Sequence, residues 1–181
     1  MNRDAHQEDT RLHRIVEAFR LVGRAYAPPE EHRLRGHVGA VVAFGAYTAA
    51  WGAVVARRKT DLPGRHEPLD IVLTATAVFR LSRLLSKGSV TSPLRAPFTR
   101  YESATGPAEV SETPRGGNIR STVGDLVTCP FCLSVWLTTT LTGAHLLWPG
   151  ATRTVTGGLT TLAISDTLQV GYDCLLQKND E

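Results

Sequence analysis

Residues Val38 to Ala56 read VGAVVAFGAYTAAWGAVVA, a stretch of 19 residues without a charged side chain. With a rise of about 1.5 Å per residue, a helix of this stretch is roughly 28 Å long, close to the thickness of a bilayer's hydrocarbon core. The stretch therefore predicts a transmembrane helix. No secretory signal peptide is visible in the highly charged residues before it, so we expect this helix to serve as the insertion signal.

Three further apolar segments follow, each interrupted by polar residues. Together the four segments predict an all-α fold, an integral membrane helical bundle of about four spans, at residues 38–56, 69–85, 131–148 and 155–176. The alternative is a soluble helical bundle, which a mean hydropathy of −0.10 and a charged fraction of 20% leave open. We expect a membrane domain at 37–176, between a charged tail at 1–36 and a short tail at 177–181.

Apolar residues recur at helical spacing between Arg11 and Tyr26, and arginines occupy the remaining positions. This pattern predicts an amino-terminal amphipathic helix, which ends before Pro28-Pro29. Such a helix can lie on an anionic membrane surface or pack on its own protein. The loop at 87–127 is rich in proline, glycine, serine and threonine, so we expect it to contain little regular structure.

Lysine and arginine residues outside the predicted spans are unequally distributed between the two sides of the membrane. Thirteen lie in the two tails and the long loop, whereas five lie on the opposite side. Cytoplasmic segments carry an excess of positive charge, so both termini and the long loop are predicted to be cytoplasmic. The net charge of only +3 fits this placement better than nucleic-acid binding. The expected partners are the lipid bilayer and other membrane proteins or further copies of the chain.

Two of the three cysteines lie in the string Cys129-Pro130-Phe131-Cys132, at the start of the third predicted span. Proline is tolerated in the first turn of a helix, which makes Cys129 the predicted N-cap. Thiolates are favoured at helix starts, so Cys129 could attack a disulfide and Cys132 could resolve it. The same pair is half of a zinc site, with Cys174 or His145 as further candidate ligands. A packing role is the third alternative. No cofactor and no catalytic residue is assigned.

Charged residues inside the predicted spans form a second group of candidates. Arg80 and Arg83 share one face of the second span, and Asp166 and Asp173 share one face of the fourth. Their similar depths predict an intramembrane pair between Arg80 and Asp166, with Arg83 or Lys87 near Asp173. Such a pair could fix the register of two helices, or it could belong to an ion path in a small transporter subunit.

Several of these residues also recur in a known family. The matching residues are Phe79-Arg80-Leu81, Arg83-Leu84, Pro93, Arg95, Gly124-Asp125-Leu126, Cys129-Pro130-Phe131-Cys132 and Trp136. In their order, they resemble a bacterial family of small multi-spanning membrane proteins catalogued as domain of unknown function 1360. The resemblance covers about Leu69 to Trp148, leaves the fourth span outside, and departs from the family at Asp125, where glutamate is usual. It implies a membrane location and transfers no catalytic residue.

We therefore expect an uncharacterised, multi-pass protein of the bacterial cell membrane with cytoplasmic termini. The expected function is that of an accessory or structural component of a membrane complex, and an enzyme is not favoured. A membrane thiol oxidoreductase that uses the cysteine string, and a small transporter subunit that uses the arginine–aspartate pair, are the two alternatives.

Overall fold

The computed structural model describes Glu17 and residues 34–58 and 67–179. The chain divides into two compact units, residues 1–40 and residues 41–181, and almost all described residues belong to the second. The predicted amphipathic helix at 11–26 lies outside the described residues, apart from the helical and exposed Glu17.

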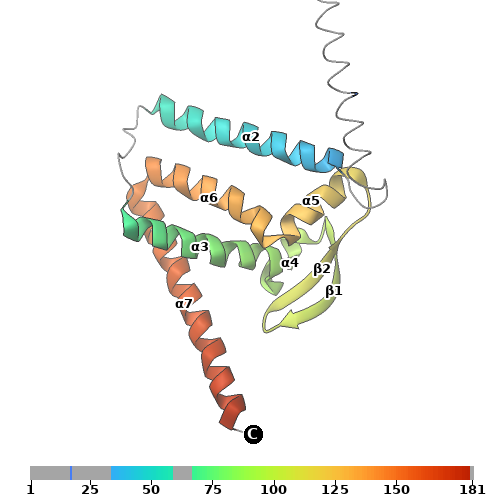
Figure 1. Ribbon diagram of the computed structural model, residues 1–181, viewed down its shortest axis with the longest axis vertical. Helices are drawn as coiled ribbons and strands as arrows, with labels where there is room; N and C mark the ends of the chain where they lie inside the picture. Colours follow the sequence, from blue (N-terminus) through green and yellow to red (C-terminus); the bar gives the residue numbers. More distant parts are fainter. Residues whose placement is uncertain (1–16, 18–33, 59–66, 180–181) are drawn as a thin grey trace, which may run out of the picture. The chain divides into compact units, whose positions relative to one another are not determined.

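Four long helices lie where the four apolar segments predict them (Figure 1). They are α2 (Leu34–Arg57), α3 (Pro68–Lys87), α6 (Pro130–Leu147) and α7 (Pro149–Asn179). The last three all begin at a proline, a residue that suits the first turn because its missing N–H would have no helical partner there. The helical part of the predicted fold is thus confirmed.

The membrane-spanning character of these helices differs from one to the next. Among the described residues, α2 is the one single helix long and apolar enough to cross a membrane. The helix α5 (Asn118–Thr128) and α6 are long and apolar enough to cross a membrane only when they are taken together, and they meet at an 81° bend. The extended backbone of Cys129 (φ −99°, ψ 108°) makes this bend, and Pro130 starts the next helix. A bundle of four spans therefore stays a prediction.

The fold is mostly helical, as predicted, and it also includes a small two-stranded sheet, so the expectation of little regular structure in the loop at 87–127 was wrong. This segment contains the 3-10 turn η1 (Ser89–Thr91), the short helix α4 (Ser92–Arg95), an antiparallel hairpin of β1 (Thr99–Gly106) and β2 (Glu109–Pro114), and α5. Pro107 occupies the turn of the hairpin, where it removes no ladder hydrogen bond. The prolines thus separate short elements.

The hairpin presents its second strand to the helices. On β2, Val110 and Glu112 are buried, whereas β1 is exposed along its length after Thr99. The helix α5 approaches β2 at Gly124, where an added Cβ would lie 2.8 Å from the Cβ of Pro114. Glycine at this position of the helix therefore permits the close packing of α5 on the hairpin.

The helix α3 packs against both α6 and α7, and the small apolar core lies where they meet. Ala77 and Val78 of α3 and Leu141 of α6 are buried there, and Leu137 and Leu159 pack around them. Few other large apolar side chains of the described residues are buried.

Burial in the described residues is reversed relative to the usual pattern of a soluble protein. The buried polar residues are Asp70, Ser82, Ser86, Arg95, Thr99, Glu112, Ser121, Thr152 and Thr156. Large apolar side chains are exposed on every long helix, among them Val41, Val42, Ile71, Val72, Phe79, Phe131, Val155, Ile164 and Leu168. Polar groups therefore face inward while apolar groups face outward.

Aromatic side chains connect α2 to α6. The ring of Trp136 lies 5.2 Å from the rings of both Phe44 and Tyr47, measured between centroids. The hydroxyl of Tyr47 lies 2.7 Å from Thr140 Oγ1, within hydrogen-bond distance. One turn further along α6, Trp51 lies against Gly143.

Replacing Gly143 by valine should displace Trp51 and weaken the packing of α2 on α6. A Cβ at position 143 would lie 2.7 Å from Trp51 Cδ2, and overpacking of this kind costs about 1–3 kcal/mol. The expected result is a lower thermal midpoint in detergent and a shift in tryptophan fluorescence. Gly52→Ala is the matched control, because a Cβ there meets no atom within 4 Å. An equal thermal midpoint and equal fluorescence in the two variants would contradict the contact between Trp51 and Gly143.

Candidate functional site

Arg80 and Asp166 join the middle of α3 to α7. Arg80 Nε lies 2.6 Å from Asp166 Oδ2, and the two side chains are 22% and 37% exposed. The contact is an ion pair without an aligned hydrogen bond, since the buried Nε makes none. The structure thus brings together Arg80 and Asp166, which were predicted to pair because they lie at similar depths along their helices. Their placement in lipid stays a prediction.

Arg83 has a different partner from the one predicted. Its guanidinium group binds Glu109 at the start of β2, with Nη2 donating to Oε2 at 2.7 Å and to Oε1 at 2.9 Å. The prediction that placed Arg83 near Asp173 was wrong, because a carboxylate from the unforeseen hairpin lies closer. Asp173 is exposed, and it makes no ion pair among the described residues.

Arg95 forms the most buried ion pair, at the junction of α3, α4 and the hairpin. Arg95 and Glu112 are 2% and 5% exposed, and two hydrogen bonds of 2.9 Å join them side by side. The remaining guanidinium hydrogens reach the carbonyl oxygens of Leu85 and Gly88 and the hydroxyl of Thr91. Arg95 thereby caps the end of α3 and holds β2 against it.

The ionisation of Glu112 is tied to this junction. Burial alone would raise the pKa of Glu112, but hydrogen bonds from Arg95, Thr99 and Ser92, with the positive charge of Arg95, outweigh it. The pKa of Glu112 therefore lies below its ordinary value. The charged carboxylate is the form that stabilises the docked hairpin.

Acid should loosen the hairpin. A lowered pKa in the folded state contributes stability above the pKa of the unfolded chain, and this stability is lost as the pH falls through the lowered value. Protease resistance of the turn around Ala108 should therefore fall on acidification in detergent. Glu112→Gln should show weaker resistance at neutral pH and lose this part of the pH dependence. An unchanged acid response in Glu112→Gln would assign the effect to other carboxylates.

A second ionic cluster lies at the opposite end of α3, and the sequence did not predict it. Arg153 of α7 donates to both oxygens of Asp70, at 2.8 and 2.7 Å, and to Glu67 at 2.8 Å. His145 Nε2 lies 3.4 Å from Asp70 Oδ2, at the far end of α6 from Cys129. The available signal was the position of Asp70 in the first turn of α3 and of Arg153 near the start of α7.

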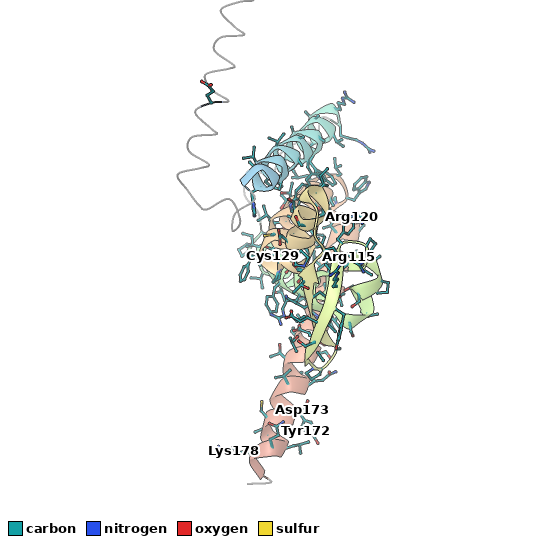
Figure 2. The ribbon with its side chains drawn as sticks, turned by 90° about the vertical axis from the view of Figure 1, so that its right-hand side faces the viewer. Arg115, Arg120, Cys129, Tyr172, Asp173 and Lys178 are labelled. Atoms are coloured by element: carbon teal, nitrogen blue, oxygen red, sulfur yellow. The ribbon has the colours of Figure 1, made fainter. Side chains whose placement is uncertain are left out.

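The cysteine turn lies at the bend between α5 and α6. Cys129 is the N-cap of α6, as predicted, and its Sγ accepts a hydrogen bond from the backbone N–H of Cys132 at 3.2 Å. Figure 2 marks Cys129 at this position. Both thiols are free, and Cys132 is exposed while Cys129 is half-buried. The turn can therefore present one thiol to a reagent or a partner with the other one helical turn away.

The third cysteine lies elsewhere. Cys174 is exposed near the end of α7. Within residues 34–58 and 67–179, no group of three or more histidine, cysteine, aspartate or glutamate side chains is arranged to hold a metal ion. Cys174 and His145 thus do not join Cys129 and Cys132 in a ligand set.

The family model described as Protein of unknown function (DUF1360) matches residues 72–172, more than half of the chain. The chain belongs to this family. The DUF1360 match includes the partners of the Arg80, Arg83 and Arg95 ion pairs, and the cysteine turn. It also includes most of α7, which the resemblance in the sequence had left outside.

One curated relative is sporulation protein YjcA of Bacillus subtilis (strain 168). It is 38% identical to this DUF1360 protein over 71 residues, which are 38% of this chain and 60% of the relative. The chain therefore matches about 60% of the length of that relative. No solved structure matches the chain.

Proposed function

We propose that this DUF1360 protein is a multi-pass protein of the bacterial cell membrane and an accessory or structural component of a membrane complex. The observation that carries the proposal is the reversed burial. Apolar side chains such as Val41, Val72 and Leu168 face outward, whereas Arg95 and Glu112 face inward. Large contiguous apolar surface is costly in water, and lipid removes that cost.

Polar side chains on the long helices support the same proposal because they are paired within the protein. Bilayer lipid offers no hydrogen bonds, so polar groups inside a membrane protein bond to one another or to backbone. Thr138, Thr139 and Thr140 each donate to the carbonyl four residues earlier in α6. Thr160 of α7 donates to the carbonyl of Leu73 on α3. These hydroxyl groups need no water.

The accessory role is inferred from what the ion pairs join. Arg80 links α3 to α7, Arg83 links α3 to β2, and Arg95 links α4 to β2. Each guanidinium group is occupied in holding two elements together, which favours a structural use over an ion path. We place the hairpin on the cytoplasmic side, because the tails and the loop carry the excess of positive charge.

Cysteine accessibility in membrane vesicles tests this placement. In a chain with all three cysteines replaced by serine, Ala108→Cys in the hairpin turn should react with an impermeant maleimide from the cytoplasmic side alone. Arg58→Cys, after the end of α2, should react from the opposite side alone. Labelling of both positions from the same side would contradict the proposed topology, and labelling of both from the cytoplasmic side alone would indicate a protein that does not cross the membrane.

The second candidate function is that of a membrane thiol oxidoreductase. The observation that favours it is the hydrogen bond between Cys129 Sγ and the N–H of Cys132, with Cys132 exposed. The purified protein should then form a reversible disulfide in a thiol–disulfide buffer, detected by mass. Cys174 is the internal control, since it should remain a free thiol. A Cys129–Cys132 pair that stays reduced in oxidised glutathione would argue against this candidate.

The description of the relative extends the proposal to spore formation. We propose that this DUF1360 protein acts during sporulation, because the similar B. subtilis protein YjcA is a sporulation protein. Expressed in a B. subtilis strain that lacks the relative, this chain should support as many heat-resistant spores as the relative itself. A lower count, with the chain present in the membrane at normal abundance, would contradict a shared role.

A further inference from the structure

The last three turns of α7 contain no buried side chain among the described residues. From residue 167 to residue 178 every side chain is exposed, including the large apolar Leu168, Val170, Tyr172 and Leu175. With 31 residues, α7 is roughly 46 Å long, whereas the 20 residues of α3 extend roughly 30 Å. In Figure 2, Tyr172, Asp173 and Lys178 lie near the free end of α7. A helix of this length and composition requires a surface to cover it.

Two unpaired charges point to the identity of that surface. Asp173 follows Asp166 by seven residues on α7, so these two aspartates share one helix face. Lys87 follows Arg80 by seven residues on α3 and likewise shares its face. Arg80 and Asp166 form an ion pair, but among the described residues neither Lys87 nor Asp173 has an ionic partner. Each copy therefore carries one unmatched cation on α3 and one unmatched anion on α7.

We propose that the last turns of α7 pack against a second copy of the chain, with Asp173 of each copy paired to Lys87 of the other. A twofold axis makes this arrangement reciprocal, since the same pair forms twice and gives both Lys87 and Asp173 of each copy a partner. The exposed apolar residues of α7 would then cover apolar surface near the end of α3, where Val90 is 76% exposed and Leu94 is 69% exposed. The proposal rests on the proposed membrane location, because an unpaired carboxylate is least tolerated in lipid.

Cross-linking between two differently tagged full-length copies tests the contact. One copy carries Val90→Cys with all native cysteines replaced by serine, so that Lys87 is retained. The other copy keeps Cys174, next to Asp173, as its single cysteine. Co-expressed in membranes and treated with a short bis-maleimide, they should give a covalent product that contains both tags. A cross-link within one chain cannot produce it.

Charge exchange tests the pairing itself. Asp173→Lys should lower the yield of the two-tag product at least tenfold, and combining Asp173→Lys with Lys87→Asp in both copies should restore it. Lys178→Ala should leave the yield unchanged, since the proposed contact does not involve this side chain. The proposal is overturned if no two-tag product forms, if the charge exchange fails to restore it, or if the detergent-solubilised protein has the mass of a monomer. Carbonate extraction of the same samples shows whether the protein is in the membrane. A failure of the proposed pairing can therefore be distinguished from a failure of the proposed membrane location.

Discussion

Replacing Arg95 by alanine should release the hairpin from α3 and destabilise the protein by about 3–5 kcal/mol, the range for removing one member of a buried ion pair. The variant leaves Glu112 with a buried charge, and it also removes the Arg95 donor from the carbonyl oxygens of Leu85 and Gly88. No other residue of the described part serves so many elements at once. We therefore expect this substitution to have the largest effect.

Two measurements check the Arg95 prediction. The thermal midpoint in detergent should fall strongly, and limited proteolysis should cut the chain within residues 99–114, where the parent resists. Arg100→Ala is the matched control, because Arg100 is an exposed arginine on the same hairpin. Arg95→Lys should recover only part of the loss, since an ammonium group cannot replace two parallel hydrogen bonds to a carboxylate. Wild-type protease resistance in Arg95→Ala would contradict the role of the pair.

Single charge reversals at Arg80 or Asp166 should prevent stable assembly of α7 on α3, and exchange of the two residues should restore it. An unpaired ion near the middle of a membrane costs on the order of 3 kcal/mol on insertion scales. Arg80→Asp and Asp166→Arg should therefore each lower the yield of detergent-stable protein. The double exchange keeps one cation and one anion at the same contact.

Folding yield by size-exclusion chromatography in detergent checks the charge exchange. Glu102→Gln is a suitable control, because Glu102 is an exposed carboxylate on β1. A double exchange no better than either single variant would show that the pair does not join the two helices. Full yield in both single variants would show that the pair does not stabilise the fold.

The sequence predicted the long helices well because their signal is local. Apolar runs and the helical repeat placed α2, α3 and α6 within four residues of their ends, whereas the predicted start of α7 was six residues late. The cap at Cys129 is equally local, since Pro130 follows it directly. The pair of Arg80 and Asp166 needed one further step, the comparison of depths along two helices.

The hairpin was not predicted because its signal is weak and non-local. Pro107 and Pro114 lie within residues 99–114 and suggested an irregular loop. What holds the hairpin is a set of contacts to distant residues, namely Arg83 to Glu109 and Arg95 to Glu112. Such pairs cannot be read from spacing when the position of the loop is unknown. The wrong partner for Arg83 follows from the same gap.

The cluster of Asp70, His145 and Arg153 was missed for a related reason. These residues belong to three helices whose ends meet only in the folded chain. In the sequence, Arg153 is only one of the five positive charges predicted to lie on the side opposite the cytoplasm. An acid in the first turn of one helix and a base near the start of a neighbouring helix of the same direction form the signal that could have identified the pair.

Alkaline carbonate extraction, followed by chromatography without detergent, tests the central claim that lipid covers the outward apolar faces. We predict that the full-length protein stays in the membrane pellet at high pH, floats with lipid in a density gradient, and aggregates when detergent is removed. Recovery of the protein in the carbonate supernatant, as a monodisperse species in plain buffer, would contradict the account.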